Sequence, residues 1–137
     1  MINDNWKTPD YLYKQLNDEF NFDFDPCPYN DGVINKENDG LLIEWGNCNY
    51  INPPYSRKLK EAFVKKAILM QKLGKTSVML LPVSTSTILF HNYIKPNATE
   101  IRFLKGRIKF ETKDIDGNFK TTKVGFFDSM LVIFKPL

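Results

Sequence analysis

The sequence predicts a protein of the α/β class whose sheet is mainly parallel, with antiparallel strands at its C-terminal side. Strand and helix patterns alternate between residues 48 and 93 in the order strand, helix, strand, helix, which favours a parallel sheet. From residue 100 onward the patterns indicate strands alone, and these add the antiparallel part. The length of 137 residues, without repeats or an evident linker, predicts a single domain over residues 1–137.

The N-terminal part is expected to contain a helix, a short strand and a long loop. Pro9 begins a helix over residues 10–20, with Thr8 as its expected N-cap, because proline is favoured in the first helical turn. Residues 22–25 alternate between Phe and Asp, which is typical of a short strand. Residues 26–47 are rich in Pro, Asn, Asp and Gly, and a loop of this length in a compact domain is usually functional.

The rest of the chain carries the alternating pattern and the added strands. Apolar residues at helical spacing predict a helix over residues 57–73, with Gly74 as its C-terminal cap. A second helix is expected over residues 84–93, and Asp116-Gly117 is a hairpin turn signal. Strands are predicted at residues 48–51, 76–81, 100–104, 107–111 and 130–134.

The motif Asn52-Pro53-Pro54-Tyr55 lies between a predicted strand and a predicted helix. It therefore sits at the carboxyl end of a strand, where open α/β sheets bind ligands. Two successive prolines remove two backbone donors and fix two φ angles, so the loop is rigid and its carbonyls are free to accept hydrogen bonds. An Asn oxygen, a Pro carbonyl and an aromatic face can together hold a planar group that carries an exocyclic NH2. The motif resembles the catalytic loop of amino-methyltransferases. The alternative is a proline-rich turn capped by Ser56.

A second motif, Trp6-Lys7-Thr8-Pro9, opens the first predicted helix. Backbone and hydroxyl groups at a helix start can bind a ligand carboxylate. An ordinary helix cap would have the same sequence, so both interpretations stay open.

Two acidic motifs follow, each at a predicted turn. Asp25-Pro26 follows the first predicted strand, where a carboxylate can face a cationic group or accept from ribose hydroxyls. Asp39-Gly40-Leu41-Leu42, with Trp45 after it, can bring a second carboxylate near an adenine. Ordinary turns are the alternative for both. No G-x-G-x-x-G sequence is present, which counts against NAD or FAD as a cofactor.

Charge is unevenly distributed along the chain, although the formal net charge is only +3. Residues 1–50 hold ten acidic and three basic residues, whereas residues 51–137 hold six acidic and sixteen basic ones. The acidic part suits a cationic ligand, and the basic part suits a phosphate backbone. A solvated surface is the alternative for any single lysine. The candidate nucleic-acid contacts are Arg57, Lys58, Lys105, Arg107 and Lys109.

Other classes of site are disfavoured by composition. Two cysteines without a CxxC spacing and a single histidine, His91, predict no metal site and free thiols in a cytoplasmic protein. No apolar run approaches the length of a membrane span, and the N-terminus lacks the apolar segment of a signal peptide.

Taken together, these motifs resemble the phage Dam-like family of DNA N6-adenine methyltransferases, over nearly the whole chain. The ordered set is more specific than the Asn52–Tyr55 motif, which is typical of amino-methyltransferases in general. The matching residues are Trp6-x-Thr8-Pro9, Phe24-Asp25-Pro26, Asp39-Gly40-Leu41, Trp45, Asn52-Pro53-Pro54-Tyr55-Ser56, Lys66-Ala67, Leu81-Pro82, Thr85, Thr87, Phe90, His91, Gly106-Arg107-Ile108-x-Phe110 and Leu131-Val132-Ile133-Phe134.

The resemblance implies a reduced Rossmann-like methyltransferase sheet and transfer of a methyl group from S-adenosylmethionine to adenine N6 in DNA. The DNA would be double-stranded, with the target adenine flipped out, and the host a bacterial cell that carries the phage or prophage. Asn52, Pro53, Pro54 and Tyr55 would be the catalytic residues. The cofactor contacts would be Trp6, Thr8, Pro9, Asp25, Pro26, Asp39 and Asn52.

Three alternatives remain at this point. The substrate could be RNA or protein, although the basic part of the chain favours nucleic acid. A degenerate methyltransferase fold could serve as a non-enzymatic DNA-binding or host-interaction module. The protein could act as a monomer or a homodimer, and its sequence specificity is expected to come from loops such as residues 26–47 or 112–128.

Overall fold

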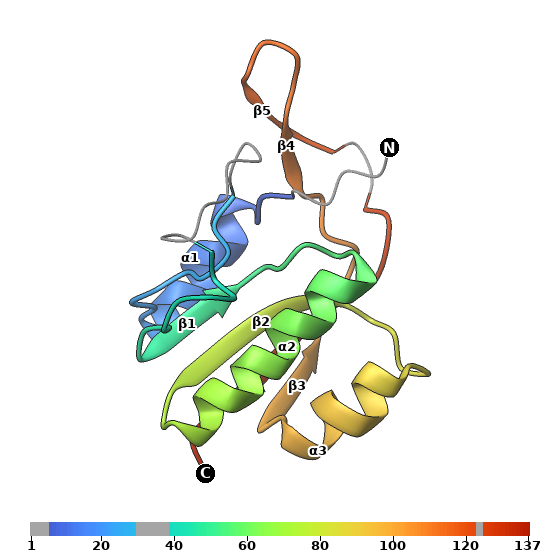
Figure 1. Cartoon of the computed structure of the whole chain (residues 1–137). Coiled ribbons are helices and arrows are strands. Elements are labelled where there is room, and N and C mark those ends of the chain that lie inside the picture. Colours follow the sequence, from blue (N-terminus) through green and yellow to red (C-terminus); the bar gives the residue numbers. More distant parts are fainter. Residues whose placement is uncertain (1–5, 30–38, 123–124) are drawn as a thin grey trace.

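The computed structural model describes residues 6–29, 39–122 and 125–137, which form a mixed α/β fold (Figure 1). The main sheet has four strands in the order β1-β2-β6-β3, and β4 and β5 form a separate two-stranded sheet. The strands are β1 (Cys48–Ile51), β2 (Thr76–Pro82), β3 (Glu100–Phe103), β4 (Glu111–Lys113), β5 (Phe119–Thr121) and β6 (Ser129–Phe134). The helices are α1 (Asp10–Phe20), α2 (Arg57–Lys72), the π-helix η1 (Leu89–Ile94) and α3 (Lys95–Asn97).

The main sheet is covered on both faces because its strands are apolar on both sides. Met79 and Leu81 of β2 face a cluster that includes α2 and η1 residues, whereas Val78 and Leu80 face a cluster that includes α1 residues. Successive side chains of a strand point to opposite faces, so each half of this alternation has a helix to pack against. All six residues of β6 are buried, in keeping with a central strand.

The expectation of a mainly parallel sheet is wrong. β1 pairs with β2 in parallel, but β6 pairs with both β2 and β3 in antiparallel fashion. Strands β1, β2 and β3 do run in the same direction, as the alternation with helices predicts. The error lies in the pairing order, because β6 enters the sheet between β2 and β3. The described residues between β3 and β6 include no helix, and β6 returns antiparallel.

Three predicted elements differ from the structure. The strand over residues 22–25 is reduced to a single parallel bridge between Phe24 and Asn49. In the predicted strand over 107–111 only Glu111 belongs to a strand. Burial nevertheless alternates along the segment, because Ile108 and Phe110 are buried whereas Arg107 and Lys109 are exposed. The helix expected over 84–93 becomes a turn followed by η1 and α3.

Side-chain hydrogen bonds explain two of the local differences at helix starts. The hydroxyl of Thr87 bonds the carbonyl of Ser84 and accepts from the N–H of Phe90, which holds a turn ahead of η1. Helix α1 begins and ends as predicted, but Thr8 does not cap it. Its hydroxyl contacts the Tyr50 hydroxyl at 2.5 Å instead.

The hairpin of β4 and β5 projects from the body of the molecule near the N-terminal segment (Figure 1). Asp116-Gly117 lies in its turn, as the sequence predicts, and Gly117 has a φ of 83°. None of the helices in the described part of the chain has the length and apolar character that a membrane span requires.

Candidate active site

The motif Asn52-Pro53-Pro54-Tyr55 leaves the carboxyl end of β1 and leads into α2. Pro53 is buried, and the other three residues are half-buried. The loop therefore lies at the edge of the sheet, where one part of it packs against the protein and another part is open to solvent.

The carboxamide of Asn52 is fixed at both ends. Its Nδ2 donates to the backbone carbonyl of Trp6 at 2.8 Å, and its Oδ1 accepts from the Tyr55 hydroxyl at 2.9 Å. A flipped amide would place Oδ1 against the Trp6 carbonyl, where no donor is available, so the two partners select one orientation. The side chain is thereby set in one position before any substrate binds.

The hydroxyl end of the Tyr55 side chain reaches into the protein from the same loop, although the residue is only half-buried. Its hydroxyl also lies 3.2 Å from the carbonyl of Leu80, and the rings of Phe110 and Phe127 meet the Tyr55 ring edge to face. Burial raises the pKa of Tyr55 well above its ordinary value, so the hydroxyl stays protonated and remains a donor.

The N-terminal segment places the Trp6 carbonyl beside Asn52. Lys7 forms an antiparallel bridge with Glu111 through two backbone hydrogen bonds of 2.8 and 3.0 Å. One residue further, the hydroxyl of Thr8 contacts that of the buried Tyr50 on β1. Residues 6–9 therefore lie across the end of β1, next to the Asn52–Tyr55 loop.

Asp25 lies beside β1 because Phe24 pairs with Asn49. One carboxylate oxygen of Asp25 accepts the N–H of Cys27 at 2.8 Å. Burial raises the pKa of this carboxyl to about 6, which outweighs the effect of that hydrogen bond. Burial raises the pKa values of Tyr13 and Tyr50, and the charge of the Asp25 carboxylate raises them further. Both rings therefore lie near this carboxylate.

The second acidic motif approaches the first through Gly40. A Cβ added at Gly40 would lie only 1.9 Å from the Pro26 carbonyl oxygen, so a larger residue does not fit without backbone movement. Burial raises the pKa of the Cys27 thiol to about 12, and the charges of Asp25 and Asp39 add to the shift. Both carboxylates therefore lie near this thiol and form an acidic region that repels anions.

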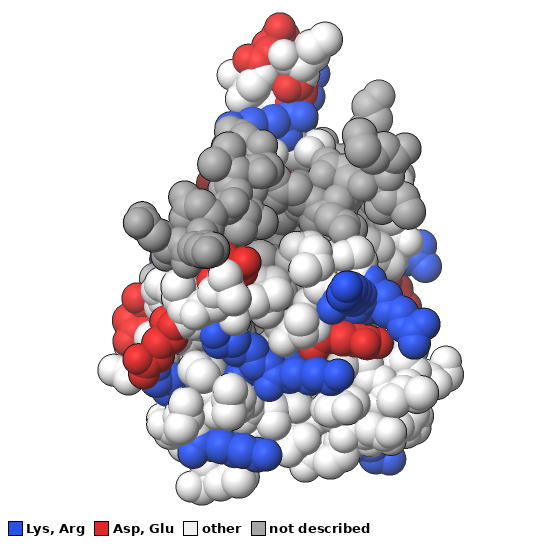
Figure 2. All heavy atoms as spheres, in the orientation of Figure 1, with Lys and Arg blue, Asp and Glu red and all other residues white. Residues whose placement is uncertain are grey.

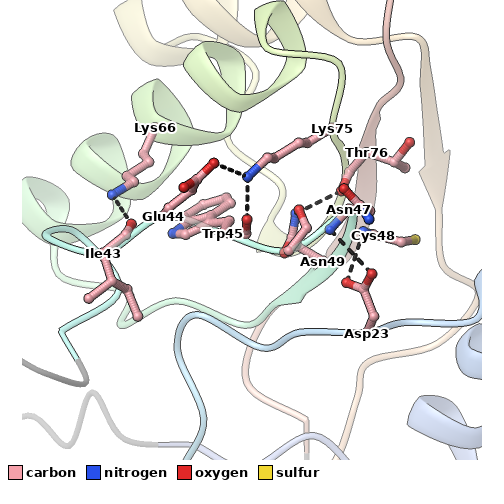
Figure 3. A network of polar contacts seen from close by, with 11 residues as sticks. Asp23, Ile43, Glu44, Trp45, Asn47, Cys48, Asn49, Lys66, Lys75 and Thr76 are labelled. Carbon is pink, nitrogen blue, oxygen red and sulfur yellow. Dashed lines mark hydrogen bonds and ion pairs between the residues drawn. The ribbon is translucent and has the colours of Figure 1, made fainter.

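The Asp39 loop is held by bonds to its backbone (Figure 3). Lys66 of α2 donates to the carbonyls of Leu41 and Ile43 at 3.1 and 2.5 Å. Lys75 donates to the Glu44 carboxylate at 2.9 Å and to the Trp45 carbonyl.

The ring nitrogen of Trp45 donates to the Gly40 carbonyl at 2.7 Å. The motif residue Trp45 is thus part of the support of this loop, buried at 2% exposure.

The sequence did not predict the supporting residues Tyr13, Tyr50, Lys66 and Lys75. Lys66 is one of the residues that carry the family resemblance, but its partners are backbone carbonyls, which every residue has. No signal in the sequence distinguishes a lysine that binds loop carbonyls from a solvated one.

The five basic candidates lie on two segments beside the Asn52–Tyr55 loop. Arg57 and Lys58 begin α2, and both are exposed. Lys105, Arg107 and Lys109 are exposed on the segment after β3. Phe110 follows this segment and contacts both Tyr55 and Trp6, which brings the segment near the Asn52–Tyr55 loop.

Basic side chains do not form one continuous patch on the visible face of the molecule (Figure 2). Arg57 and Arg107 pair with the carboxylates of Glu61 and Asp128, at 3.3 and 3.1 Å. Gly125 lies against Arg107, since an added Cβ would come within 2.3 Å of the Arg107 Cβ. Such exposed pairs contribute little to stability, so both arginines can exchange their partners for phosphates.

Metal ligation has no support in the described ranges, where no group of three or more His, Cys, Asp or Glu residues is placed to hold an ion. Both cysteines are free thiols. His91 is exposed on η1 and contacts the Phe90 ring edge to face.

Comparison with known proteins identifies one family. A family model described as DNA N-6-adenine-methyltransferase (Dam) matches residues 1–137. Neither the curated proteins nor the solved structures contain a match to the chain. The family match extends over the N-terminal segment, both acidic motifs and the Asn52–Tyr55 loop. The chain therefore belongs to the family of DNA N-6-adenine-methyltransferases (Dam).

Proposed function

We propose that the protein transfers a methyl group from S-adenosylmethionine to N6 of an adenine in double-stranded DNA. The observation that carries this proposal is the Asn52 carboxamide, fixed between the Trp6 carbonyl and the Tyr55 hydroxyl at the carboxyl end of β1. Such a preset acceptor matches what an adenine amino group needs. The family of the chain supplies the class of substrate.

The acidic region around Cys27 fits a cationic cofactor. Burial raises the pKa of the half-buried Asp25 carboxyl to about 6, and no cation among the described residues offsets that shift. A positively charged sulfonium or amino group would provide that compensation. When bound, S-adenosylmethionine supplies an electrophilic methyl group. The residues that would hold it are Trp6, Thr8, Pro9, Asp25, Pro26, Asp39 and Asn52.

Asn52 and Pro53 would activate the amino group by positioning it. The lone pair of adenine N6 is delocalised into the ring, which makes the amine a poor nucleophile. Acceptors at Asn52 Oδ1 and the Pro53 carbonyl would hold both N–H groups so that the lone pair leaves conjugation. Positioning of this kind can supply a large part of a rate enhancement. Once methylated, the nitrogen can release its proton to water.

The Asn52 oxygen can serve Tyr55 and the adenine at once, because a carbonyl oxygen has two lone pairs. The ring of Tyr55 would stack on the flipped base, an interaction worth roughly 1–3 kcal/mol. Pro54 would keep the loop rigid. Arg57, Lys58, Lys105, Arg107 and Lys109 would contact the DNA backbone.

The setting of the reaction is also part of the proposal. Residues 1–137 would act as one domain with a Rossmann-like cofactor site and methylate a defined DNA sequence. The resemblance to phage enzymes would place the protein in the cytoplasm of a bacterial host.

Calorimetric titration with S-adenosylmethionine, followed by methyl-transfer assays on DNA, RNA and peptide, tests the proposal. We expect saturable cofactor binding and transfer to DNA. Replacement of Asn52 by alanine should lower turnover by on the order of a hundredfold or more, as does loss of one preorganised polar group in other enzymes. The exposed Asn92 provides the matched control, and Asn92→Ala should leave turnover unchanged. Activity of Asn52→Ala near that of the wild type would refute the assigned role.

A further inference from the structure

The β4–β5 hairpin is the part of the described chain that extends furthest from the sheet (Figure 1). Its strands pair in antiparallel register from Glu111 opposite Thr121 to Lys113 opposite Phe119. All three residues of β5 are exposed. The hairpin is therefore a two-stranded ribbon with solvent around its outer part.

The tip of this ribbon is held in one conformation. The carboxylate of Asp114 accepts the N–H groups of Asp116 and Asn118 at 2.9 and 3.0 Å, and the N–H of Asp114 donates to the Asn118 carbonyl at 2.8 Å. Gly117 supplies the positive φ that the turn needs. Ile115, fully exposed at 100%, is displayed at the end of this turn.

The base of the hairpin is attached directly to the catalytic loop. Glu111 pairs with Lys7, and the residue before Lys7 supplies the carbonyl that holds the Asn52 amide. On the other side, Phe110 contacts the Tyr55 ring. A DNA duplex that presents an adenine to Asn52 must therefore pass beside this hairpin.

Aromatic and cationic groups brace the lower part of the hairpin. The Phe119 ring of β5 meets the Tyr29 ring edge to face at 5.2 Å. The Lys7 ammonium lies over Phe119 at 4.9 Å, and that of Lys113 lies over Phe119 at 5.5 Å. These contacts fix the direction in which the ribbon leaves the body.

We infer that the β4–β5 hairpin enters the major groove of DNA beside the target adenine and reads base edges with Asp116, Asn118 and Ile115. This inference rests on the proposed function. The major groove admits a two-stranded ribbon and is roughly 8.5 Å deep. The three residues of β4 span roughly 10 Å as a strand, which exceeds this depth and is enough for the tip to reach the base edges.

The chemistry of the tip favours bases over phosphates. Acidic side chains near the tip are visible in Figure 2, and they would repel a phosphate backbone. In the major groove a carboxylate accepts from the cytosine amino group, an Asn amide pairs with adenine, and an apolar side chain contacts the thymine methyl. Asp116, Asn118 and Ile115 are exposed and provide one group of each kind.

Selection from a pool of DNA duplexes with a randomised central sequence tests the inference through binding. Wild-type protein should enrich a preferred sequence. The variants Asp116→Ala, Asn118→Ala and Ile115→Ala should each lose preference at a distinct base pair, by about tenfold for the polar residues. An unchanged preferred sequence in all three variants would overturn the inference, as would failure of the wild type to bind duplexes or to select among them.

Two controls keep the outcome decisive. Leu73→Ala changes an apolar residue, 61% exposed, at the far end of α2, and should leave the selected sequence unchanged. Thermal melting and calorimetric titration with S-adenosylmethionine should give wild-type values for the three tip variants, because the tip lies outside the proposed cofactor site. Failure of the proposed function is scored separately, as absence of methyl transfer by a wild-type protein that still selects DNA.

Discussion

At the scale of single residues, two hydrogen bonds determine the orientation of the Asn52 carboxamide. One of its two fixed partners is a backbone carbonyl, and the other is the Tyr55 hydroxyl. The sequence predicted the four loop residues but not this arrangement. Backbone carbonyls are present at every position, so nothing in the sequence could indicate that Trp6 would supply the one beside Asn52.

Replacement of Tyr55 by phenylalanine separates the hydroxyl from the ring. We expect turnover to fall by roughly fivefold, since one net hydrogen bond contributes about 1 kcal/mol. The KM for DNA should change less than twofold because the ring is retained. Steady-state kinetics measure both, and Tyr11→Phe, at an exposed residue of α1, is the matched control. Equal losses of turnover in Tyr55→Phe and Tyr11→Phe would show that the Tyr55 hydroxyl has no specific role in the site.

The buried Asp25 carboxyl makes two opposite predictions about pH. Its pKa is raised from 3.8 to about 6, so ionisation costs the folded protein free energy. Stability should therefore fall as pH rises through the interval between those two values, by on the order of 2–3 kcal/mol. Affinity for a cationic cofactor should rise over the same interval, because only the ionised carboxylate attracts it.

Asp25→Asn tests both signs at once. Without cofactor the variant should melt at a higher temperature than the wild type at pH 7, and the difference should vanish below about pH 4. Its cofactor affinity should be weak and independent of pH. Asp18→Asn, at an exposed position of α1, should reproduce the wild-type pH profiles. Identical profiles for Asp25→Asn and the wild type would contradict both the burial of this group and its proposed role.

At the scale of elements, the sequence predicted where helices and strands lie better than how strands pair. Helix α1 has the predicted bounds, and α2 begins at the predicted residue, because their apolar spacing is regular. The position of β6 could not be read in this way. All six of its residues are buried, so no alternation marks which neighbours it has.

Contact between two loops is the element-scale feature that joins the acidic motifs. Gly40→Ala should destabilise the protein and weaken cofactor binding, because the added Cβ would collide with the Pro26 carbonyl. Gly74→Ala is an informative comparison, since open space surrounds Gly74 but its φ of 86° strains any larger residue. It should cost about 1 kcal/mol of stability and leave cofactor affinity intact. Thermal melting and calorimetry distinguish the two, and equal cofactor affinity in both variants would contradict the proposed cofactor site.

At the scale of the whole molecule, folding mixes the acidic and basic parts of the chain. Arg102 forms two 2.7 Å bonds with Glu19 and also pairs with Glu100, so this basic residue serves the fold. The uneven charge of the sequence predicted a nucleic-acid partner class, in agreement with the family. It could not distinguish basic residues that hold the protein together from those that are available to DNA.

The salt dependence of DNA binding distinguishes these two kinds of arginine. Each phosphate contact releases counterions, so losing one lowers the slope of log affinity against log salt concentration by about 1. Arg107→Gln should weaken binding to all duplexes and lower that slope, because Asp128 is its only ion-pair partner among the described residues, and that pair is exposed. Arg102→Gln should keep the slope and cost up to about 1 kcal/mol of stability. Fluorescence anisotropy titrations over a range of salt concentrations measure the slope. An unchanged slope in Arg107→Gln would mean that the DNA backbone does not contact the segment after β3. The DNA would then not lie on the face where Phe110 contacts Tyr55.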